Sequence, residues 1–436
     1  MNGETTLTSA DPPPFDVVII GAGAAGLLAA ARCGERGLRT VCIEKNRKAG
    51  VKILISGGTR CNLTHDCDRR GIIEAFGSAG SFLHSALAAL GPRETVELFN
   101  REGLPTYVEP DTGKIFPSSD RALDVVRVLV DLVGRSGAEL ALDEPAVSIE
   151  RDGDGFCVVT SRRRLRCRKL LISVGGRSYP GCGTTGDGYR WLSELGHTIR
   201  PPRPALVPLT SAEPWVRELS GIVIDVVLRV VTADGAPVPP TPGRRRAGLA
   251  ANVLIERRGA LLFTHTGVSG PAVLDVSRAV TGAKSPQQVA LEADLLPDSP
   301  QADLERQLQS SATTDGKKQI INALPQELPR RLVEVAFAQA EVPVDRRGAE
   351  LSKAECSRLA VALKRLRIPV SGSRGFEKAE VTAGGVALDE VDSKTMQSKL
   401  VPNLYLAGEI LDLDGYIGGY NFQAAFSTAW LAADNL

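Results

Sequence analysis

The sequence predicts an α/β protein built on a doubly wound parallel sheet, with an inserted β-rich domain and a small helical subdomain. Three observations support this class. The compact apolar run Val17–Ile20 leads directly into a glycine-rich turn and an Ala/Leu-rich segment. A second glycine-rich turn, at residues 415–421, precedes another apolar segment near the C-terminus. Between them, residues 200–264 alternate β-branched runs with Pro/Gly loops, whereas residues 302–365 have helical spacing.

The composition indicates a globular protein of two or three domains. The chain has 436 residues, of which 43% are hydrophobic and 24% charged, and its net charge of +1 gives no overall field that would attract nucleic acid or a membrane surface. The eight cysteines have no C-x-x-C or metal-ligand spacing, so we expect a reducing cytoplasmic location and no metal. The uncharged run Val17–Ala31 is shorter than the roughly 20 residues of a membrane span.

The strand Val17–Ile20 begins the first nucleotide-binding motif. It is followed by Gly21-Ala-Gly23-Ala-Ala-Gly26 and by a helix expected over Ala24–Arg36, which Gly37 ends. A second strand, Arg39–Ile43, then leads to Glu44. Strand, G-x-G-x-x-G, helix, strand and acid together are the full context that dinucleotide binding requires.

Each residue of this motif has a physical role. Gly21 permits the tight turn, Gly23 lets the backbone approach a pyrophosphate, and Gly26 lets the helix pack closely on the strand. The helix N-terminus, at Ala24 and Ala25, offers N–H groups to the phosphates, and Glu44 can accept hydrogen bonds from ribose hydroxyls. The motif alone leaves FAD and NAD open, because both carry an adenosine ribose.

A second G-x-G-x-x-G match, Gly181–Gly186, follows the strand predicted over Lys169–Val174. A loop intervenes, and the strand near His197–Ile199 ends in Arg200 and prolines rather than in an acid. We therefore interpret this segment as a loop that folds over a cofactor bound by the first motif, not as a second nucleotide domain.

The C-terminal segment favours a flavin. A strand predicted over Val401–Leu406 ends at Gly408 and Glu409, and Gly418, Gly419 and the candidate N-cap Asn421 precede a helix over residues 422–432. An extended FAD needs a second strand end and a second helix N-terminus at the same sheet edge. That helix would place positive potential where reduced flavin accumulates negative charge. The alternative is a glycine-rich loop before a capped terminal helix.

The chain resembles the BaiN/aminoacetone-oxidase-like family of NAD(P)/FAD-dependent oxidoreductases. The similar segments follow one another in the order of that family and cover most of residues 15–436. They are Lys52-Ile-Leu-Ile-Ser56-Gly-Gly-Thr-Arg60-Cys-Asn62, Ser173–Pro180 with Thr185–Tyr189, Leu262–Pro271, Val381–Val386 with Met396–Lys399, and Leu404–Glu409 with Gly418–Gln423.

The resemblance implies noncovalently bound FAD, a split flavin domain with two inserted segments, and a Ser56–Asn62 loop that lies along the flavin. Thr59 stands where the family has a glycine, His65 where asparagine is usual, and Gln397 where glutamate is usual. The motifs and the resemblance together give these candidate cofactor-binding residues: Gly21, Gly23, Ala24, Ala25, Gly26, Glu44, Lys45, Lys52, Ser56, Gly57, Gly58, Arg60, Cys61, Asn62, Val147, Gly175, Gly176, Gly408, Glu409, Gly418, Gly419, Asn421 and Phe422.

We expect four divisions of the chain. Residues 1–14 form a disordered leader, and residues 15–199 and 373–436 form the discontinuous FAD-binding domain. Residues 200–272 and 365–372 form a β-rich substrate or cap domain, and residues 273–364 a helical insertion.

Few residues outside the flavin motifs point to chemistry. No hydrolase or metalloenzyme motif is present, and the catalytic residues cannot be assigned from the sequence. His265 precedes a glycine-rich turn, but a histidine bonded to backbone is the favoured interpretation; for Cys61 a packed thiol is favoured over a redox role. The basic clusters Arg162–Lys169 and Arg244–Arg246 are interpreted as solvated edges or loops.

The predicted function is hydride transfer at flavin N5 to or from a small organic substrate, with no nucleic-acid or membrane partner. NAD(P)H-linked reduction of a conjugated ketone, with NAD(P)H bound transiently, is favoured. One alternative is a flavin amine oxidase that passes electrons to oxygen. Others are a flavin-dependent protein that modifies or binds nucleic acid, with the Arg162–Lys169 cluster as its contact surface, and an NAD-binding dehydrogenase without flavin.

Overall fold

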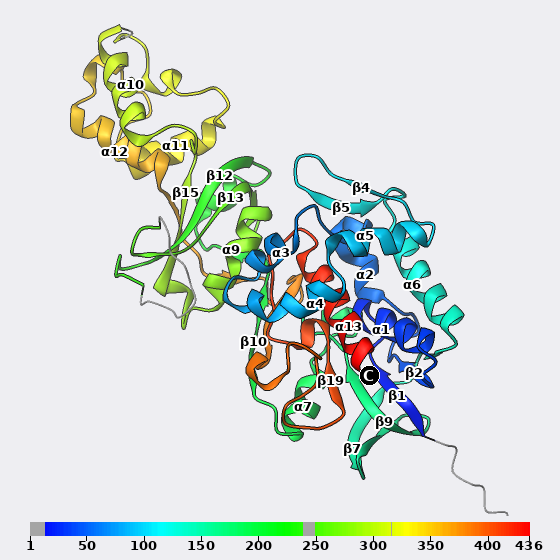
Figure 1. Ribbon diagram of the computed structural model, residues 1–436. Helices are drawn as coiled ribbons and strands as arrows, with labels where there is room; N and C mark the ends of the chain where they lie inside the picture. Colours follow the sequence, from blue (N-terminus) through cyan, green and yellow to red (C-terminus); the bar gives the residue numbers. More distant parts are fainter. Residues whose placement is uncertain (1–13, 239–248, 315) are drawn as a thin grey trace, which may run out of the picture. The chain divides into compact units, whose positions relative to one another are not determined.

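The computed structural model describes residues 14–238, 249–314 and 316–436, and the chain divides into two compact units (Figure 1). Unit 1 takes in residues up to 176 together with 180–202 and 384–436, and unit 2 takes in 177–179 and 203–383. The expected leader, apart from Pro14, and the cluster Arg244–Arg246 lie outside the described residues. No described helix combines the length and the apolar character of a membrane span.

Unit 1 is built on a mostly parallel sheet, which confirms the doubly wound fold class. Its strands β6, β2, β1, β9 and β19 run parallel, and β8 and β7 continue the sheet from β9 as an antiparallel pair. In sheet order they are β6 (Glu139–Ala141), β2 (Thr40–Ile43), β1 (Phe15–Ile20), β9 (Arg164–Ile172), β8 (Gly155–Thr160) and β7 (Ala146–Asp152), with β19 (Leu404–Leu406) paired to β9.

The parallel strands end in register. Ile20 of β1 lies opposite Ile43 of β2 and Ile172 of β9, and Ile172 lies opposite Leu406 of β19. The turns that follow these four strands therefore leave the same edge of the sheet, although Leu406 is nearly the whole chain away from Ile20 in sequence. This edge is where ligands of doubly wound sheets bind.

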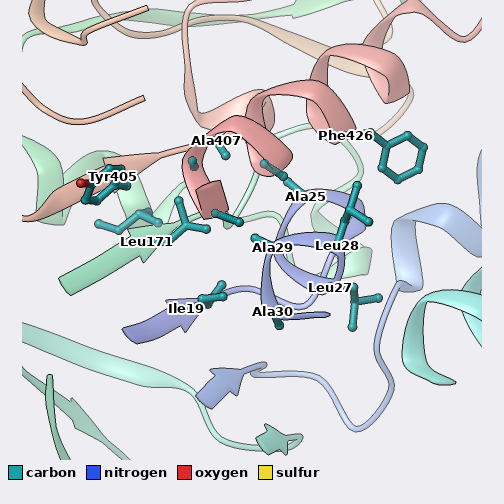
Figure 2. Packing of buried hydrophobic residues seen from close by; sticks show 14 of the residues in the cluster. Ile19, Ala25, Leu27, Leu28, Ala29, Ala30, Leu171, Tyr405, Ala407 and Phe426 are labelled. Atoms are coloured by element: carbon teal, nitrogen blue, oxygen red, sulfur yellow. The ribbon is translucent and has the colours of Figure 1, made fainter. Parts of the chain in front are cut away.

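Helix α1 (Ala24–Glu35) packs against α13 (Tyr420–Asn435) and α6 (Ala122–Ser136). Small residues on α1, such as Ala25, Ala29 and Ala30, are buried beside the sheet, with Phe426 of α13 in the same cluster (Figure 2). Alanines allow close approach of the two helices, so the first and last segments of unit 1 share one core.

The remaining elements of unit 1 surround the sheet edge. A three-stranded antiparallel sheet, in the order β3-β5-β4, follows the loop after α2. The elements are α2 (Val51–Ile55), β3 (Thr64–His65), α3 (Arg69–Ala75), α4 (His84–Ala89), α5 (Pro92–Arg101), β4 (Thr106–Val108), β5 (Lys114–Pro117) and α7 (Asp187–Glu194). A two-stranded sheet, β10 (Ile199–Ala205) with β18 (Val381–Val386), is formed where the chain passes between the units.

Unit 2 contains an antiparallel seven-stranded sheet and a group of helices. In sheet order its strands are β16 (Leu366–Ile368), β15 (Val289–Asp294), β12 (Val223–Thr232), β13 (Val253–Thr264), β14 (Gly267–Ser269), β11 (Leu209–Thr210) and β17 (Gly372–Ser373). Its helices are α8 (Pro214–Glu218), α9 (Pro271–Thr281), α10 (Gln301–Thr314), α11 (Arg330–Gln339) and α12 (Lys353–Lys364).

One strand of unit 2 was not predicted from the sequence. β15 (Val289–Asp294) lies within residues 273–364, for which only helices were expected, yet it pairs with β12 and β16 inside the sheet. Five of its six residues are buried, so it lacks the alternation of a half-buried strand. Within residues 302–365, for which helical spacing was expected, Ile320–Ala323 form only a single 3-10 turn.

Candidate functional site

The first glycine turn has the geometry that the sequence motif predicts. Gly21 adopts a φ of +102°, and a Cβ there would lie 2.9 Å from the Ser173 carbonyl oxygen. A Cβ at Gly26 would collide with the Gly21 carbonyl oxygen, whereas one at Gly23 would meet no protein atom within 4 Å. The backbone at Gly23 is therefore open to a ligand, as a pyrophosphate requires.

The N-terminus of α1 is available to an anion. The helix begins at Ala24, no side chain caps it, and its first turn carries no acidic residue. The N–H groups of a helix N-terminus carry partial positive charge and need acceptors. Ala24 and Ala25 thus occupy the position at which a phosphate is bound in such turns.

Glu44 lies beside this turn, at the end of β2. Its carboxylate accepts a hydrogen bond from the Ala22 N–H at 2.9 Å and from the Asn46 N–H at 2.9 Å, and the Asn46 amide nitrogen donates another at 2.8 Å. A carboxylate has about four acceptor positions, so one remains for a ribose hydroxyl. Glu44 therefore also fixes the shape of the turn, a role the sequence did not reveal.

The second glycine-rich match contacts the loop that follows β2. The Asn46 side chain donates to the Cys182 carbonyl oxygen at 3.0 Å, and Lys45 Nζ lies 2.6 Å from both Thr185 Oγ1 and Asp187 Oδ2. The next strand, β10, pairs with β18 and not with β9. The segment therefore does not form a second βαβ unit.

The N- and C-terminal motifs meet at one sheet edge. Lys52 Nζ forms a 2.6 Å ion pair with Glu409 Oε2, and a Cβ at Gly408 would lie 3.2 Å from Ala25 Cβ. Gly408 has a φ of +77°, and its N–H donates to Thr428 Oγ1 of α13 at 3.0 Å. Two stretches more than 350 residues apart thus line a single edge.

The loop at residues 56–59 follows α2 with its backbone in the left-handed region. Gly57, Gly58 and Thr59 have φ values of +53°, +66° and +71°, and Ser56 Oγ donates to the Ile53 carbonyl oxygen at 2.7 Å. A Cβ at Gly58 would meet nothing within 4 Å. Thr59 carries the strain that a β-branched residue has in this region, where the family's glycine would be relaxed.

Arg60 and Cys61 do not face outward as donors to an anion. The Arg60 guanidinium pairs with the Glu109 carboxylate at 3.2 Å and lies over the Phe116 ring at 3.9 Å. The Cys61 thiol is fully buried, and burial raises its pKa to about 12, so it stays protonated at neutral pH. This environment agrees with the packed-thiol interpretation of Cys61.

Asn62 and His65 join this loop to the C-terminal glycine turn. The Asn62 amide oxygen accepts from the Gly419 N–H at 2.9 Å, and its nitrogen donates to the Thr64 carbonyl oxygen at 2.8 Å. His65 Nδ1 lies 3.0 Å from the Gly418 carbonyl oxygen, and its ring stacks on Tyr420 with centroids 4.6 Å apart. Burial lowers the pKa of His65. Because a carbonyl oxygen can only accept, the contact with Gly418 requires the proton on Nδ1. The sequence singled out His65 only as a departure from the family.

The start of α13 differs from the sequence prediction in one respect. Its N-cap is Gly419, with a φ of +92°, and not Asn421. Asn421 is the second helical residue, and its side chain turns back to bond the backbone of Gly415, accepting from the N–H at 2.8 Å and donating to the carbonyl oxygen at 3.1 Å. Phe422 packs on Phe426 along the same helix. The N-cap residue Gly419 has no side chain to cap α13, and its N–H donates to Asn62.

Three further candidates follow neighbouring strands. Gly175, with a φ of +72°, and Gly176 come after β9, at the shared sheet edge. Val147 belongs to β7. Just before this strand, the Glu144 N–H donates to the Glu44 carbonyl oxygen at 2.8 Å, so the start of β7 lies beside the loop after β2. Val147 has 52% of its surface exposed.

The basic cluster on β9 is neutralised by acids. Arg162 pairs with Asp143, Arg163 with Glu144 and Glu139, Arg164 with Glu150, and Arg166 with Asp152. These arginines are therefore ion-paired and do not form a positive patch. Within the described ranges no group of His, Cys, Asp or Glu side chains could hold a metal, and each of the eight cysteines is a free thiol.

The comparisons with known proteins span both units. The model of the HI0933-like protein Rossmann domain matches residues 15–435. The chain is 35% identical over 422 residues to a ribosomal RNA dihydrouridine synthase of Escherichia coli, covering 97% of this chain and 98% of that one. It is 32% identical over 427 residues to the enzyme of that name from Haemophilus influenzae, covering 95% and 97%. It is also 28% identical over 421 residues to a 3-dehydro-bile acid delta(4,6)-reductase of Clostridium scindens, covering 95% and 97%.

Proposed function

We propose that this protein saturates a carbon–carbon double bond conjugated to a carbonyl group, in a uracil base of ribosomal RNA. The premise is that the chain belongs to the HI0933-like protein Rossmann domain family and is an FAD-dependent oxidoreductase. The observation that carries the proposal is the end-to-end match to two ribosomal RNA dihydrouridine synthases at 35% and 32% identity. Those matches include both units of the chain.

The relatives share one chemistry across two substrate classes. A dihydrouridine synthase saturates the double bond of a uracil ring, and a delta(4,6)-reductase saturates double bonds of a 3-oxo steroid. In both cases the bond is conjugated to a carbonyl, so hydride addition at one carbon builds negative charge on the carbonyl side. The expected reduction of a conjugated ketone is the same reaction type. The uracil substrate departs from our expectation that nucleic acid is not a partner.

FAD fits the residues of unit 1. The open backbone at Gly23 and the uncapped N-terminus of α1 would take the pyrophosphate, and Glu44 the adenosine ribose. Lys52 and Glu409 lie at the strand end where the ribityl chain would pass. The N-terminus of α13, which begins at Tyr420, would face the pyrimidine side of the flavin.

The reduction needs one hydride and one proton. When bound, FAD supplies the hydride, and we propose NADH or NADPH, bound transiently, as the reductant. The positive end of α13 would stabilise negative charge on the flavin ring. Asn62 and His65 hold the Gly418–Gly419 backbone that shapes this end of the site.

The test combines a spectrum with an RNA assay. The purified protein should be yellow, its flavin should bleach when NADH or NADPH is added under argon, and unmodified ribosomal RNA made by transcription should re-oxidise it. Dihydrouridine in the digested RNA, detected by mass spectrometry as a uridine gaining two hydrogens, is the expected product. No dihydrouridine from RNA that contains the natural target sequence contradicts the proposal.

The same assay separates the other functions. Consumption of a conjugated 3-oxo steroid, with RNA left unchanged, would assign the substrate class of the bile-acid relative. Flavin that NADH and NADPH do not bleach, but that small amines reduce with formation of hydrogen peroxide, would assign the amine oxidase. A colourless protein that takes up no FAD would remove the flavin itself.

A further inference from the structure

A polar patch lies at one edge of the unit 2 sheet, and we propose that it binds a phosphate group of the RNA. We call it the Arg374 patch, and it consists of Arg374, His265, Thr266, Thr210 and Ser371. The inference rests on the proposed function and adds to it a recognition site outside the flavin unit. None of these residues is needed to hold the nucleotide fold of unit 1.

The sheet brings the patch together from three distant segments. β11 lies between β14 and β17, with Thr210 opposite Gly267 on one side and Gly372 on the other. His265 and Thr266 form the tight connection between β13 and β14. The Ser211 N–H donates to the Thr266 carbonyl oxygen at 3.1 Å, which fixes this connection beside β11.

Donor groups at the patch have few protein partners. Arg374 is exposed, and Nη1 donates to Thr266 Oγ1 at 3.3 Å; among the described residues the arginine has no carboxylate partner. Thr210 Oγ1 and Ser371 Oγ share a 3.0 Å hydrogen bond. A guanidinium has five N–H donors in a planar fork, so most of the Arg374 donors remain for an oxyanion. His265 is exposed beside them.

Arg374 differs in this from several exposed arginines that pair with carboxylates. Arg166 pairs with Asp152, Arg258 with Asp298 and Asp225, and Arg330 with Glu334. An arginine that keeps its charge without a carboxylate partner, next to hydroxyl groups, is typical of phosphate recognition.

The charge of the chain is divided unevenly between the units. Unit 2 has 25 lysines and arginines against 20 aspartates and glutamates, a net charge of +5. Unit 1 has 27 against 31, a net charge of −4. The total of +1 hides this asymmetry, and unit 2 is the one whose field attracts a polyanion.

Residues 177–179 belong to unit 2 and contact the segment that follows Arg374. The Tyr179 N–H donates to the Phe376 carbonyl oxygen at 2.9 Å, and the Arg177 guanidinium lies over the Phe376 ring at 4.7 Å. Arg177 follows Gly176, and Phe376 is two residues from Arg374. These contacts hold the segment that carries Arg374 within unit 2.

The experiment uses the full-length protein with FAD and the transcribed ribosomal RNA. We expect Arg374→Ala to weaken RNA binding about tenfold and to lower the slope of log Kd against log salt by about 1. The KM for RNA should rise while kcat and flavin reduction by NAD(P)H stay unchanged. Thr266→Val should give a smaller effect of the same kind. Arg330→Ala, which removes an exposed arginine paired with Glu334, is the matched control.

The outcomes distinguish this inference from the proposed function. If the wild type forms dihydrouridine and Arg374→Ala binds RNA within twofold of it with the same salt slope, the patch is wrong and the function stands. If Arg374→Ala loses FAD, the residue serves the cofactor and the patch is also wrong. If the wild type neither binds nor reduces the RNA, both the proposed function and the inference fail.

Discussion

At the scale of single residues, several side chains of the site hold the protein together as well as face a ligand. Glu44 is the clearest case, because it bonds the Ala22 and Asn46 backbone while one acceptor position remains. Its contribution to FAD binding is therefore partly direct, through the ribose, and partly through the shape of the glycine turn.

We predict that Glu44→Ala raises the Kd for FAD about 10- to 100-fold, since a hydrogen bond to a charged group contributes roughly 1.5–3 kcal/mol. Flavin fluorescence during titration of the apoprotein measures this. Glu35→Ala, at the exposed end of α1, is the control. Flavin occupancy that survives extensive dialysis as well as in the wild type would count against the ribose assignment.

His197 shows a second residue-scale property, a buried histidine held neutral. Its Nδ1 lies 3.1 Å from the Glu390 carboxylate and its Nε2 lies 2.8 Å from Ser398 Oγ. Burial lowers the pKa of His197 below 6.5, the ordinary value, although Glu390 opposes this. Below pH 6.5 the folded state therefore binds fewer protons than the unfolded state. The contribution of the neutral His197 to the free energy of unfolding is complete above pH 6.5 and is lost as the pH falls.

We therefore expect the free energy of unfolding of the wild type to decrease as the pH drops below 6.5. His197→Gln should reduce the steepness of this decrease, and the part due to His65, whose pKa burial also lowers, should remain. Urea titrations between neutral and mildly acidic pH measure the slope, with His84→Gln, an exposed residue of α4, as the control. Equal slopes in wild type and His197→Gln would contradict the assignment.

At the scale of elements, two glycines of the β1–α1 turn have different roles. Gly26 is required by the fold, whereas Gly23 is required by the ligand. A side chain at Gly26 collides with the protein's own backbone, whereas one at Gly23 points into space that no protein atom occupies. The two glycines look alike in the motif, and only their surroundings distinguish them.

This difference gives a paired prediction. Gly26→Ala should destabilise the apoprotein by about 1–3 kcal/mol, because helix α1 must move away from the strand. Gly23→Ala should leave the stability of the apoprotein within about 0.5 kcal/mol of the wild type but lower its FAD affinity at least about tenfold. Denaturant unfolding without FAD and a flavin titration measure the two effects. The idea is wrong if Gly23→Ala unfolds the apoprotein as Gly26→Ala does.

At the scale of the whole molecule, the chain consists of two compact units with opposite net charge, and the candidate cofactor residues lie in unit 1. A ligand that binds only folded protein stabilises the unit that holds it by mass action. Units joined by a few chain segments need not unfold together.

Calorimetry of the apoprotein should then show two transitions. FAD at 100 times its Kd should stabilise one of them by about 2.7 kcal/mol and leave the other in place. The transition that moves should be the one that Gly26→Ala lowers, which identifies it as unit 1. A single transition, or an equal shift of both, would show that the units unfold as one.

The sequence by itself determined the local parts of this protein. The β1–α1–β2 unit, the left-handed glycine turns and the terminal helix follow from periodicity and from glycine chemistry within windows of about thirty residues. The same local rules predicted α10, α11 and α12 and the antiparallel strands of unit 2. They failed for β15, because a strand buried on both faces has no alternation to detect.

Only the tertiary structure decided which partner each side chain takes. It paired Arg60 with Glu109, gave the N-cap of α13 to Gly419 instead of Asn421, and placed His65 against Gly418. It also left Arg374 without a carboxylate while it neutralised the arginines of β9. A hydrogen bond or ion pair depends on atoms a few ångströms apart in space, and the partners here come from segments that no local pattern relates.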